Sequence, residues 1–475
     1  MGAEQHGRPR DAETHALAAF VSEIDAGTLS ADVVARAKQI VADSIACAIG
    51  GLSLAPEISL PILRYAQAIG GKGDATVIGG GAAAAPVAAL TNATLVHTID
   101  FDDTHMASIG HFGGPVTATA LAALESVGGS GGDLIAAVVG GFEAGGKVGR
   151  SVLPDHYQRW HSTASLGGIA AAAAAARARG LDARQTDMAI GFAADDAGGT
   201  RYCIKVGDFS KSLHAGTAAW KGSQGALLAA LGAEGPTGLL EHPIGFYWAY
   251  SEERTAERLA PEIESLGSRW EVLEDDIKAL PSIHASHTPV EATIEIVSDH
   301  DIAPGDIADI HVTHPFFSDG HALNYEPDSQ MAARLSIPFC VAVAAMDRRL
   351  DLSSFEDSQY LRDDVRSLMR RVTTTSDESL NERYPDTTMS RVRLSTVRGG
   401  VHEVEIVYPR GSHRRPLSEE EHGHKVEDLL SRSLPDDAVR DLMASLHDLE
   451  SLPSVRPIAA SMARATRAHR QEARA

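Results

Sequence analysis

The feature that most constrains the fold is a long succession of apolar segments with helical spacing, separated by glycines, in the first half of the chain. Val33 and Ile40 belong to one such segment, which follows Ser30, a residue type that commonly caps helix N-termini. Pro86 stands where the first turn of another helix is expected. Up to about Trp270 the sequence therefore predicts an all-helical region.

Small residues mark the second part of this helical region. The alanine-rich block 170–176 has the highest helix propensity of the chain, and Gly180 is well placed to end that helix. Three glycines interrupt a later apolar helix, namely Gly216, Gly222 and Gly225. Because glycine has no side chain, we expect neighbouring helices to approach closely at these three positions.

The periodicity changes after Lys278. Apolar and polar residues alternate in the segment 309–313 and again on both sides of Gly399 and Gly400, a pattern that predicts strands and a hairpin. The segment 331–346 between them predicts a helix that Pro338 breaks or kinks. Helical periodicity returns after Ser418, which forms a capping-box pattern with the glutamate three residues later.

Composition narrows the class of protein. The chain has 475 residues, so two domains are expected, and its formal net charge of -22 argues against a nucleic-acid partner. The three cysteines (Cys47, Cys203 and Cys340) lie far apart, without the spacing of a zinc or iron–sulfur site. No apolar signal core and no uninterrupted membrane-length apolar run is found. We therefore expect a cytoplasmic protein without a membrane partner.

The segment 97–111 is the first place to look for chemistry. It contains three histidines (His97, His105 and His111) and three aspartates (Asp100, Asp102 and Asp103) within fifteen residues of an alanine- and glycine-rich region. Ionisable groups are costly to bury unless they are paired, so such a density favours a functional site. Individual members also have simpler interpretations, because Asp102 and Asp103 are as well suited to be helix caps or partners of His105, and His105 is as well suited to the surface.

Further polar clusters precede expected helices or stand at the change of periodicity. They are Trp160-His161-Ser162-Thr163, Ser210-Lys211-Ser212-Leu213-His214, the segment 278–287 with His284 and His287, and the segment 411–418. Taken alone, a loop histidine is usually a surface or capping residue, and Lys211 a solvated lysine. Their order along one chain is more specific than any single cluster.

In this order and content the clusters resemble the MmgE/PrpD family, which includes 2-methylcitrate dehydratase, cis-aconitate decarboxylase and iminodisuccinate epimerase. The resemblance covers nearly the whole chain. It rests on IDFDDTH (99–105) followed by His111, HSTASLGG (161–168), SKSLHAG (210–216), KALPSIHASH (278–287), ARLSIPF (333–339) and GSHRRPLS (411–418).

The resemblance implies a mainly α fold, in which a large all-helical domain is built from both chain ends and a smaller α+β lid domain is inserted. Residues 1–275 and 412–475 would form the helical domain, and residues 276–411 the lid. It also implies a homodimer that needs no organic cofactor or metal. Family members move a proton at a carbon next to a carboxylate, coupled to loss of water or carbon dioxide or to inversion, so the partner would be a small carboxylate substrate.

By matching the motifs residue by residue, the resemblance implies a cleft lined by Asp100, Thr104, His111, His161, Lys211 and His287. A cation such as Lys211 or a protonated histidine would stabilise the enolate-like charge that forms next to a carboxylate. An equal alternative is that Lys211 only anchors a carboxylate of the substrate. His111 and His161 titrate nearest neutral pH and are the candidates for proton transfer, with Asp100 orienting or charging one imidazole. Thr104 is assigned a hydrogen bond to substrate, and His287 contributes from the lid side.

Two positions depart from the family pattern. Phe112 and the glycines after it replace a usual Pro-Ser or Pro-Gly pair, and His284 stands where an arginine is common. Loss of a permanent bidentate carboxylate clamp indicates a substrate with different or fewer carboxylates, or recognition that depends on pH. We therefore include Phe112 and His284 among the predicted substrate-binding residues.

The leading hypothesis is a cofactor-independent lyase of the 2-methylcitrate dehydratase or cis-aconitate decarboxylase type, acting on a small di- or tricarboxylate. An epimerase or isomerase of the iminodisuccinate type would use two bases on opposite faces of one carbon. A helical binding protein that has lost catalysis is the third hypothesis, and the presence of all six polar site residues argues against it.

Overall fold

The structure is a computed structural model that describes residues 13–254, 256–315 and 322–466. Its first part is predominantly helical, as predicted. The α-helices of this part are α1 (Glu13–Glu23), α2 (Ala31–Leu54), α3 (Pro56–Ile69), α4 (Ala85–Val96), α5 (Gly113–Val127), α6 (Gly131–Val152), α7 (Asp155–Arg159), α8 (Ser162–Ala178), α9 (Ala183–Asp195), α10 (Tyr202–Val206), α11 (Phe209–Ala230), α12 (Phe246–Tyr250) and α13 (Ala260–Glu264).

Two short antiparallel pairs of strands correct the prediction that this region is entirely helical. One pair joins β1 (Ala75–Val77) to β2 (Gly81–Ala83), where glycines with positive φ turn the chain. The other joins β3 (Thr104–His105) to β4 (Asp275–Asp276), which are far apart in the sequence. These strands are too short to produce a detectable alternation.

The four-stranded sheet lies in the later part of the chain. Its strands are β5 (Ile307–His314), β6 (Val372–Ser376), β7 (Ser390–Thr396) and β8 (Val401–Ile406), in the order β6-β5-β7-β8. β6 runs parallel to β5, and the other neighbours are antiparallel. The predicted hairpin is confirmed, with Gly399 at positive φ in its turn.

Helices lie beside this sheet, and further helices follow it in the sequence. They are α14 (His287–Asp299), α15 (Gln330–Arg334), α16 (Ile337–Asp347), α17 (Asp363–Met369), α18 (Glu419–Ser431), α19 (Asp436–His447) and α20 (Arg456–Met462). Pro338 stands in the first turn of α16, so the predicted break falls between α15 and α16. Ser418 and Glu421 form the predicted capping box of α18.

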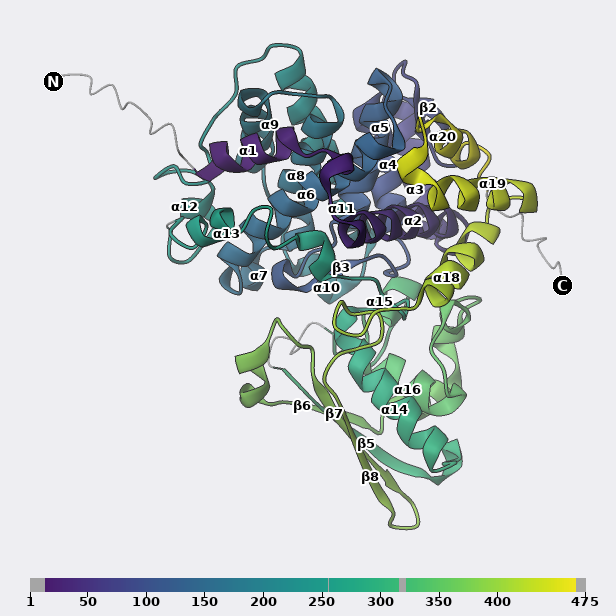
Figure 1. Cartoon of the computed structure of the whole chain (residues 1–475). Coiled ribbons are helices and arrows are strands. Elements are labelled where there is room, and N and C mark those ends of the chain that lie inside the picture. The colour runs from purple at the N-terminus through teal and green to yellow at the C-terminus, as the bar shows by residue number, and fades with distance from the viewer. Residues whose placement is uncertain (1–12, 255, 316–321, 467–475) are drawn as a thin grey trace.

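The buried apolar side chains form two main cores. The first joins residues 17–272 to residues 426–465, so the C-terminal helices pack with α2 in one helical unit. The second joins α14 and α16 to one face of the four-stranded sheet and defines a sheet unit, residues 287–406. Figure 1 shows the helical unit above and the sheet unit below. The domain boundaries at 275/276 and 411/412 stay a prediction.

Close helix packing at glycines is confirmed along α11. A Cβ atom added to Gly216 would lie 2.0 Å from Thr94 Oγ1, and one added to Gly222 would lie 2.4 Å from Ala171 Cβ. α11 therefore lies directly against α4 and α8. Since Lys211 is in its first turn, this packing also positions a predicted site residue.

The helix α2 is long and apolar enough to cross a membrane by length and composition alone. The sequence analysis did not identify it, because its apolar residues are interrupted by charged ones. Within its most apolar window, 83% of the residues are buried inside the protein. It carries Asp43, which forms an ion pair with Lys425 at 2.6 Å, and it packs against α18. This burial is typical of a core helix in a soluble protein, and the expectation of no membrane partner stays a prediction.

Candidate active site

The histidine- and aspartate-rich segment connects α4 to α5 and is held at both ends. His97 is the C-cap residue of α4, while Thr104 and His105 pair with Asp276 and Asp275. Within the segment, Asp100 has a φ of 51°, a left-handed conformation that is uncommon outside glycine and is often found at functional sites. The segment is therefore a constrained loop, and its aspartate and histidine side chains are almost all buried.

Asp100 is the centre of a buried charge cluster. Its Oδ1 accepts hydrogen bonds from Lys278 Nζ at 2.6 Å and from Lys211 Nζ at 3.3 Å. Burial alone would raise the pKa of Asp100, but the two ammonium groups outweigh it and hold that pKa well below its usual range. One carboxylate thus holds two cations, and its Oδ2 is buried without a hydrogen-bond partner among the described residues.

His97 links this cluster to a second carboxylate. Its Nδ1 donates to Asp102 Oδ2 at 2.8 Å, so its Nε2, 2.8 Å from Lys211 Nζ, accepts from that ammonium. Burial lowers the pKa of His97, consistent with a neutral ring between Asp102 and Lys211. Asp102 therefore orients an imidazole, the role that the sequence analysis gave to Asp100.

His111 stands between the charge cluster and the pocket. Its Nδ1 lies 2.6 Å from the Asp103 carbonyl oxygen, an acceptor only, so Nδ1 carries the proton and Nε2 is bare. Thr104 Oγ1 lies 3.4 Å from the same Nδ1, and the His111 ring centroid lies 4.5 Å from that of His97. Burial and the charges of its neighbours lower the pKa of His111 well below its usual value.

His161 is the residue directly before α8, and its side chain lies near the cluster. Its ring centroid lies 6.3 Å from that of His97, and its Nδ1 lies 3.0 Å from the Nδ1 of His214. One of these two nitrogens must donate, so at least one ring carries its proton on Nδ1. Burial lowers the pKa of both rings, well below the usual value for His161 and to about 4 for His214.

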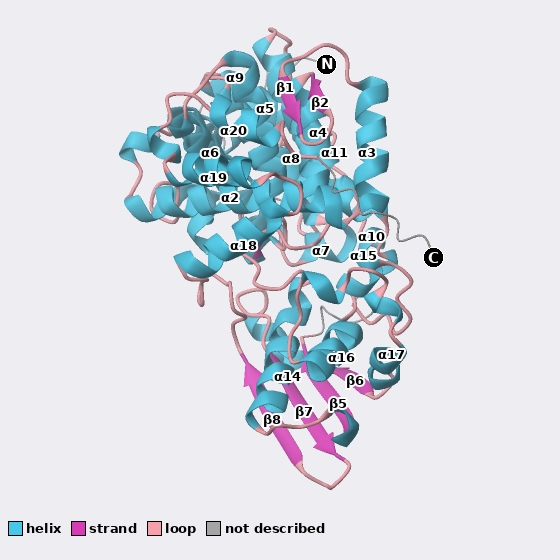
Figure 2. Ribbon diagram, turned by 90° about the vertical axis from the view of Figure 1, so that its right-hand side faces the viewer, coloured by secondary structure: helices cyan, strands magenta, loops and turns pink. Residues whose placement is uncertain are grey.

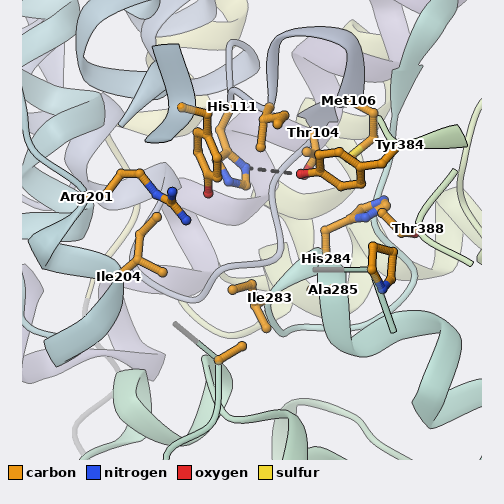
Figure 3. Close-up of a pocket in the computed structure, with 14 residues that line it drawn as sticks. Thr104, Met106, His111, Arg201, Ile204, Ile283, His284, Ala285, Tyr384 and Thr388 are labelled. Atoms are coloured by element: carbon orange, nitrogen blue, oxygen red, sulfur yellow. Dashed lines mark hydrogen bonds between the residues drawn. The ribbon is translucent and has the colours of Figure 1, made fainter. Parts of the chain in front are cut away.

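A pocket opens beside this cluster (Figure 3). Thr104 and His111 line it from the helical side, and His284 and Tyr384 face them from the later part of the chain. Arg201 adds a guanidinium group to the wall. The lining thus joins both parts of the chain, as a site between the two predicted domains requires.

Five of the predicted residues therefore come together: Asp100, Thr104, His111, His161 and Lys211. His284 lines the pocket, and its Nε2 lies 3.1 Å from Asp276 Oδ2. His287 lies behind it, with ring centroids 5.2 Å apart and its Nε2 3.3 Å from the Ser282 carbonyl. His287 does not line the pocket, and neither do Asp100, His161 and Lys211, so contact of these four side chains with substrate stays a prediction.

The Phe112 ring is fully buried, stacked on His105 and edge-on to Phe142. It does not line the pocket, and the geometry favours a packing role over the predicted substrate contact. Its backbone N–H and that of Gly113 both donate to Asp103 Oδ2, at 3.0 and 2.9 Å. The Asp103 carboxylate therefore caps the start of α5, but it does so from a distant position in the loop, since the N-cap residue itself is Phe112.

His105 is buried, contrary to its interpretation as a surface residue. Its Nε2 bonds Glu271 Oε2 at 3.0 Å, and its Nδ1 bonds Ser108 Oγ at 2.9 Å. Glu271 also contacts Lys147 and Arg150. These contacts fix the position of His105 in the histidine-rich loop.

Sequence reasoning gave no role to several residues of the site. His97 opens the segment 97–111 and Lys278 opens a quoted motif, and the density of ionisable groups there was the available signal. Asp102 was interpreted only as a helix cap or a partner of His105, whereas it bonds His97. Arg201 and Tyr157 stand outside every motif, and nothing in their local sequence distinguishes them from surface residues. Only the fold brings them to the pocket.

Two groups of ligand-type side chains lie close enough to hold a cation. In the first, His97, Asp100, Asp102 and His111, the ammonium groups of Lys211 and Lys278 already contact His97 and Asp100 and would repel a divalent ion. In the second, His161, Cys203 and His214, burial raises the pKa of the Cys203 thiol to about 11, which opposes the thiolate that zinc requires. Neither donor set favours a metal.

Comparison with known proteins gives a consistent assignment. Cis-aconitate decarboxylase of Aspergillus terreus is 27% identical over 469 residues, 94% of each chain. The Mus musculus enzyme of the same name is 26% identical over 468 residues, 92% of this chain and 91% of the relative. The Homo sapiens enzyme is 27% identical over 467 residues, 92% of each chain.

The family models match in the same order as the motifs. The MmgE/PrpD N-terminal domain matches residues 15–259, and the MmgE/PrpD C-terminal domain matches residues 281–449. The first match includes Asp100, His111, His161 and Lys211, and the second includes His284. With both domains in order over most of its length, this chain belongs to the MmgE/PrpD family.

Proposed function

We propose that this protein is a cofactor-independent carboxy-lyase that acts on a small unsaturated polycarboxylate of the cis-aconitate type. The observation that carries the proposal is the buried cluster in which Asp100 holds Lys211 and Lys278 beside two neutral imidazoles, next to the pocket. Such a site can bind carboxylates and also supply a proton. Relatives named cis-aconitate decarboxylase support decarboxylation over the dehydration that the sequence analysis left equally open.

The reaction needs little beyond charge and a proton. In a substrate with a double bond β,γ to the departing carboxylate, the carbon–carbon bond breaks and carbon dioxide leaves. The electron pair forms a new double bond, and the old one shifts its electrons to a carbon beside a remaining carboxylate. That carbon then takes one proton, so the net change is replacement of carbon dioxide by a proton.

Lys211 and Lys278 fit the first half of this reaction. Ammonium groups in a site of low dielectric stabilise the enediolate-like charge that develops on the remaining carboxylate. Asp100 and His97 hold Lys211 in place, so little reorganisation is needed when that charge appears. Thr104 would donate a hydrogen bond to the substrate.

His111 and His161 are the candidates for the proton donor. Both are neutral in the empty site because burial lowers their pKa. A bound polycarboxylate brings negative charge next to these rings and raises their pKa, so the substrate itself favours the protonated, acidic form. His111 is the better placed of the two, because it lines the pocket.

The test is proton NMR in deuterium oxide with cis-aconitate, 2-methylcitrate, citrate and iminodisuccinate. We expect new vinyl signals from cis-aconitate alone, with one deuterium in the product methylene. Loss of an α-proton signal from iminodisuccinate without a new compound would favour the epimerase, and vinyl signals from 2-methylcitrate the dehydratase. No change with any of the four would contradict a lyase for these substrates.

The same proposal includes a cytoplasmic homodimer. Light scattering coupled to size-exclusion chromatography tests the assembly, because one chain has a mass of 50.1 kDa and a dimer would have twice that mass. A mass of one chain would contradict the dimer without affecting the chemistry, since the polar groups described above all belong to one chain.

A further inference from the structure

Arg201 is a cation in the wall of the pocket that has no hydrogen-bond or ion-pair partner among the residues that the structure describes. It follows the isolated bridge between Trp160 and Thr200 and precedes α10, so its backbone is held on both sides. Its side chain is half-buried, and the guanidinium carbon lies 4.2 Å from the centre of the Tyr157 ring. Figure 3 shows the guanidinium directed toward His111 and the interior of the pocket.

No described residue neutralises this charge. Arg201 forms no hydrogen bond or ion pair within the described parts of the chain, and its Nε is buried without an acceptor. Arg179 Nε and Arg334 Nη2 are also buried without an acceptor, but each of those guanidinium groups makes another hydrogen bond within the described parts of the chain. Arg334 donates to the Pro281 carbonyl at 2.7 Å, and Arg150 donates to Glu271 at 2.8 Å. A partly desolvated guanidinium group without a hydrogen-bond acceptor costs free energy unless a ligand supplies the acceptor.

The rest of the pocket is suited to an anion. Its described lining residues include no aspartate or glutamate, although the chain as a whole carries a net charge of -22. His284 also faces the pocket, but its Nε2 already lies 3.1 Å from the carboxylate of Asp276. Arg201 is therefore the permanent, uncommitted positive charge among the described lining residues.

We propose that Arg201 binds a carboxylate of the substrate that does not react, by a two-pronged hydrogen bond from its guanidinium group. The inference rests on the proposed function for the class of ligand. Lys211 and Lys278 are held by Asp100 in the buried cluster, whereas Arg201 lies in the wall of the adjoining pocket. Arg201 thus distinguishes a tricarboxylate from a dicarboxylate and takes the place of the clamp that His284 does not provide.

The experiment is isothermal titration with tricarballylate, a saturated tricarboxylate, and with glutarate and methylsuccinate, which each have one carboxylate fewer. Arg201→Gln should weaken tricarballylate binding by about 10- to 100-fold, the loss expected for hydrogen bonds to a charged group. Binding of at least one dicarboxylate should change by less than about threefold, because it lacks the carboxylate that Arg201 holds. Arg201→Lys should give an intermediate loss. The matched control is Arg159→Gln, an exposed arginine of α7 whose partner is Glu252.

Thermal unfolding separates this role from a structural one. Without ligand, Arg201→Gln should leave the melting temperature unchanged or raise it, since an unpaired charge is removed, and the rise caused by tricarballylate should shrink. A lower melting temperature in the empty variant, equal losses for all three ligands, unchanged affinity, or no tricarballylate binding to the wild-type protein would each overturn the proposal.

These outcomes are independent of turnover. If tricarballylate binds through Arg201 but cis-aconitate is not decarboxylated, the proposed function fails and the clamp stands. If cis-aconitate is decarboxylated with the same kcat and KM by Arg201→Gln, the clamp fails and the proposed function stands.

Discussion

Asp100 and Lys211 form the pair on which the proposed chemistry depends most. Asp100 is ionised because two ammonium groups compensate its burial, so it is a fixed counter-charge and a poor proton donor. Lys211 is in turn held by Asp100 and His97. A neutral side chain of similar length at position 211 would remove one of the two ammonium groups and leave Asp100 paired with Lys278.

We therefore expect Lys211→Met to lower turnover of cis-aconitate by about 100-fold or more, the loss typical of one electrostatic donor at a reacting centre. The fold should persist, because the remaining ion pair is intact, and circular dichroism checks this. Lys72→Met, at an exposed lysine, is the control and should keep full activity. Near-normal turnover in Lys211→Met would remove Lys211 from the mechanism.

His111 and His161 allow a prediction about protons. Both rings are neutral in the empty site because their pKa values are lowered, and an anionic ligand raises those values. Binding of tricarballylate near pH 7 should therefore take up protons, about one per site if one ring dominates. Titration calorimetry in buffers of different ionisation enthalpy measures this uptake.

The variants His111→Gln and His161→Gln show which of the two rings takes up the proton. At least one of them should reduce it, while His300→Gln, at an exposed histidine, should not. Proton release on binding, or an uptake that neither variant changes, would contradict the proposal that these rings carry the proton.

At the residue scale, motifs predicted the site where ionisable residues are clustered along the chain. Asp100, Thr104, His111, His161 and Lys211 were predicted by matching these motifs to the family resemblance, residue by residue, and they do come together. Arg201 and Tyr157 were not, because each reaches the pocket from a segment of ordinary composition. Phe112 was assigned to substrate from its position next to His111, but neighbours in a loop can point in different directions, and its ring points into the core.

At the scale of elements, the start of α5 is coupled to the ionisation of Asp103. Burial and the nearby Asp102 raise the pKa of Asp103 to about 7, from about 4 in an unfolded chain. Between these values the folded protein binds more protons than the unfolded one, so this group lowers stability as pH rises from about 4 to 7. Burial likewise raises the pKa of Asp275, which adds in the same direction.

Asp103→Asn should therefore weaken the fall of stability over this range of pH. The amide oxygen can still accept from the backbone N–H groups of Phe112 and Gly113, so the cap is retained. Urea denaturation at several pH values between 4.5 and 7.5 measures the slope. Equal slopes for the variant and the wild-type protein would show that Asp103 does not hold the extra proton.

The contact of α11 with α8 gives a prediction about packing. A Cβ at Gly222 would meet Ala171 Cβ at 2.4 Å and backbone atoms at 2.5 Å, which cannot move aside as a flexible side chain can. Gly222→Ala should destabilise the protein by about 1–3 kcal/mol. Gly423→Ala in α18 is the control, since nothing lies within 4 Å of its Cβ position, and it should be neutral or stabilising by up to about 1 kcal/mol.

Thermal denaturation of both variants tests this comparison. Equal stability would show that α8 and α11 can separate without cost. Because α11 begins just before Lys211, Gly222→Ala should also lower activity, whereas Gly423→Ala should not.

The helices and the hairpin were predictable because their patterns are long or have characteristic turn residues. The break at Pro338 and the cap at Ser418 follow from local chemistry. β6 was not predicted, although the β-branched residues of Val372–Ser376 favour a strand, because its five residues show no alternation of apolar and polar side chains and its partner β5 is distant in sequence. β3 and β4 have only two residues each, which is too short for a sequence pattern, and their pairing depends on the tertiary fold.

At the scale of the whole molecule, the two units meet where the pocket lies. The helical unit contributes Thr104 and His111, and the sheet unit contributes Tyr384. Lys278, which stands just before the sheet unit in the sequence, pairs with Asp100. A ligand held by groups of both units would favour the arrangement that brings them together. This is the physical basis for expecting the sheet unit to act as a lid.

We expect tricarballylate to shift and narrow the distribution of distances between the two units. Spin labels at Lys72→Cys in the helical unit and Arg398→Cys in the hairpin turn measure it by pulsed electron resonance. The native cysteines are buried, so labelling should be selective. Dilution with unlabelled protein removes signals between subunits of a dimer. Because Lys278 and the β3–β4 pair hold the segment that leads into the sheet unit against the histidine-rich loop, the change should be a modest closure with Asp100 near the pivot. Identical distributions with and without saturating ligand would contradict a lid.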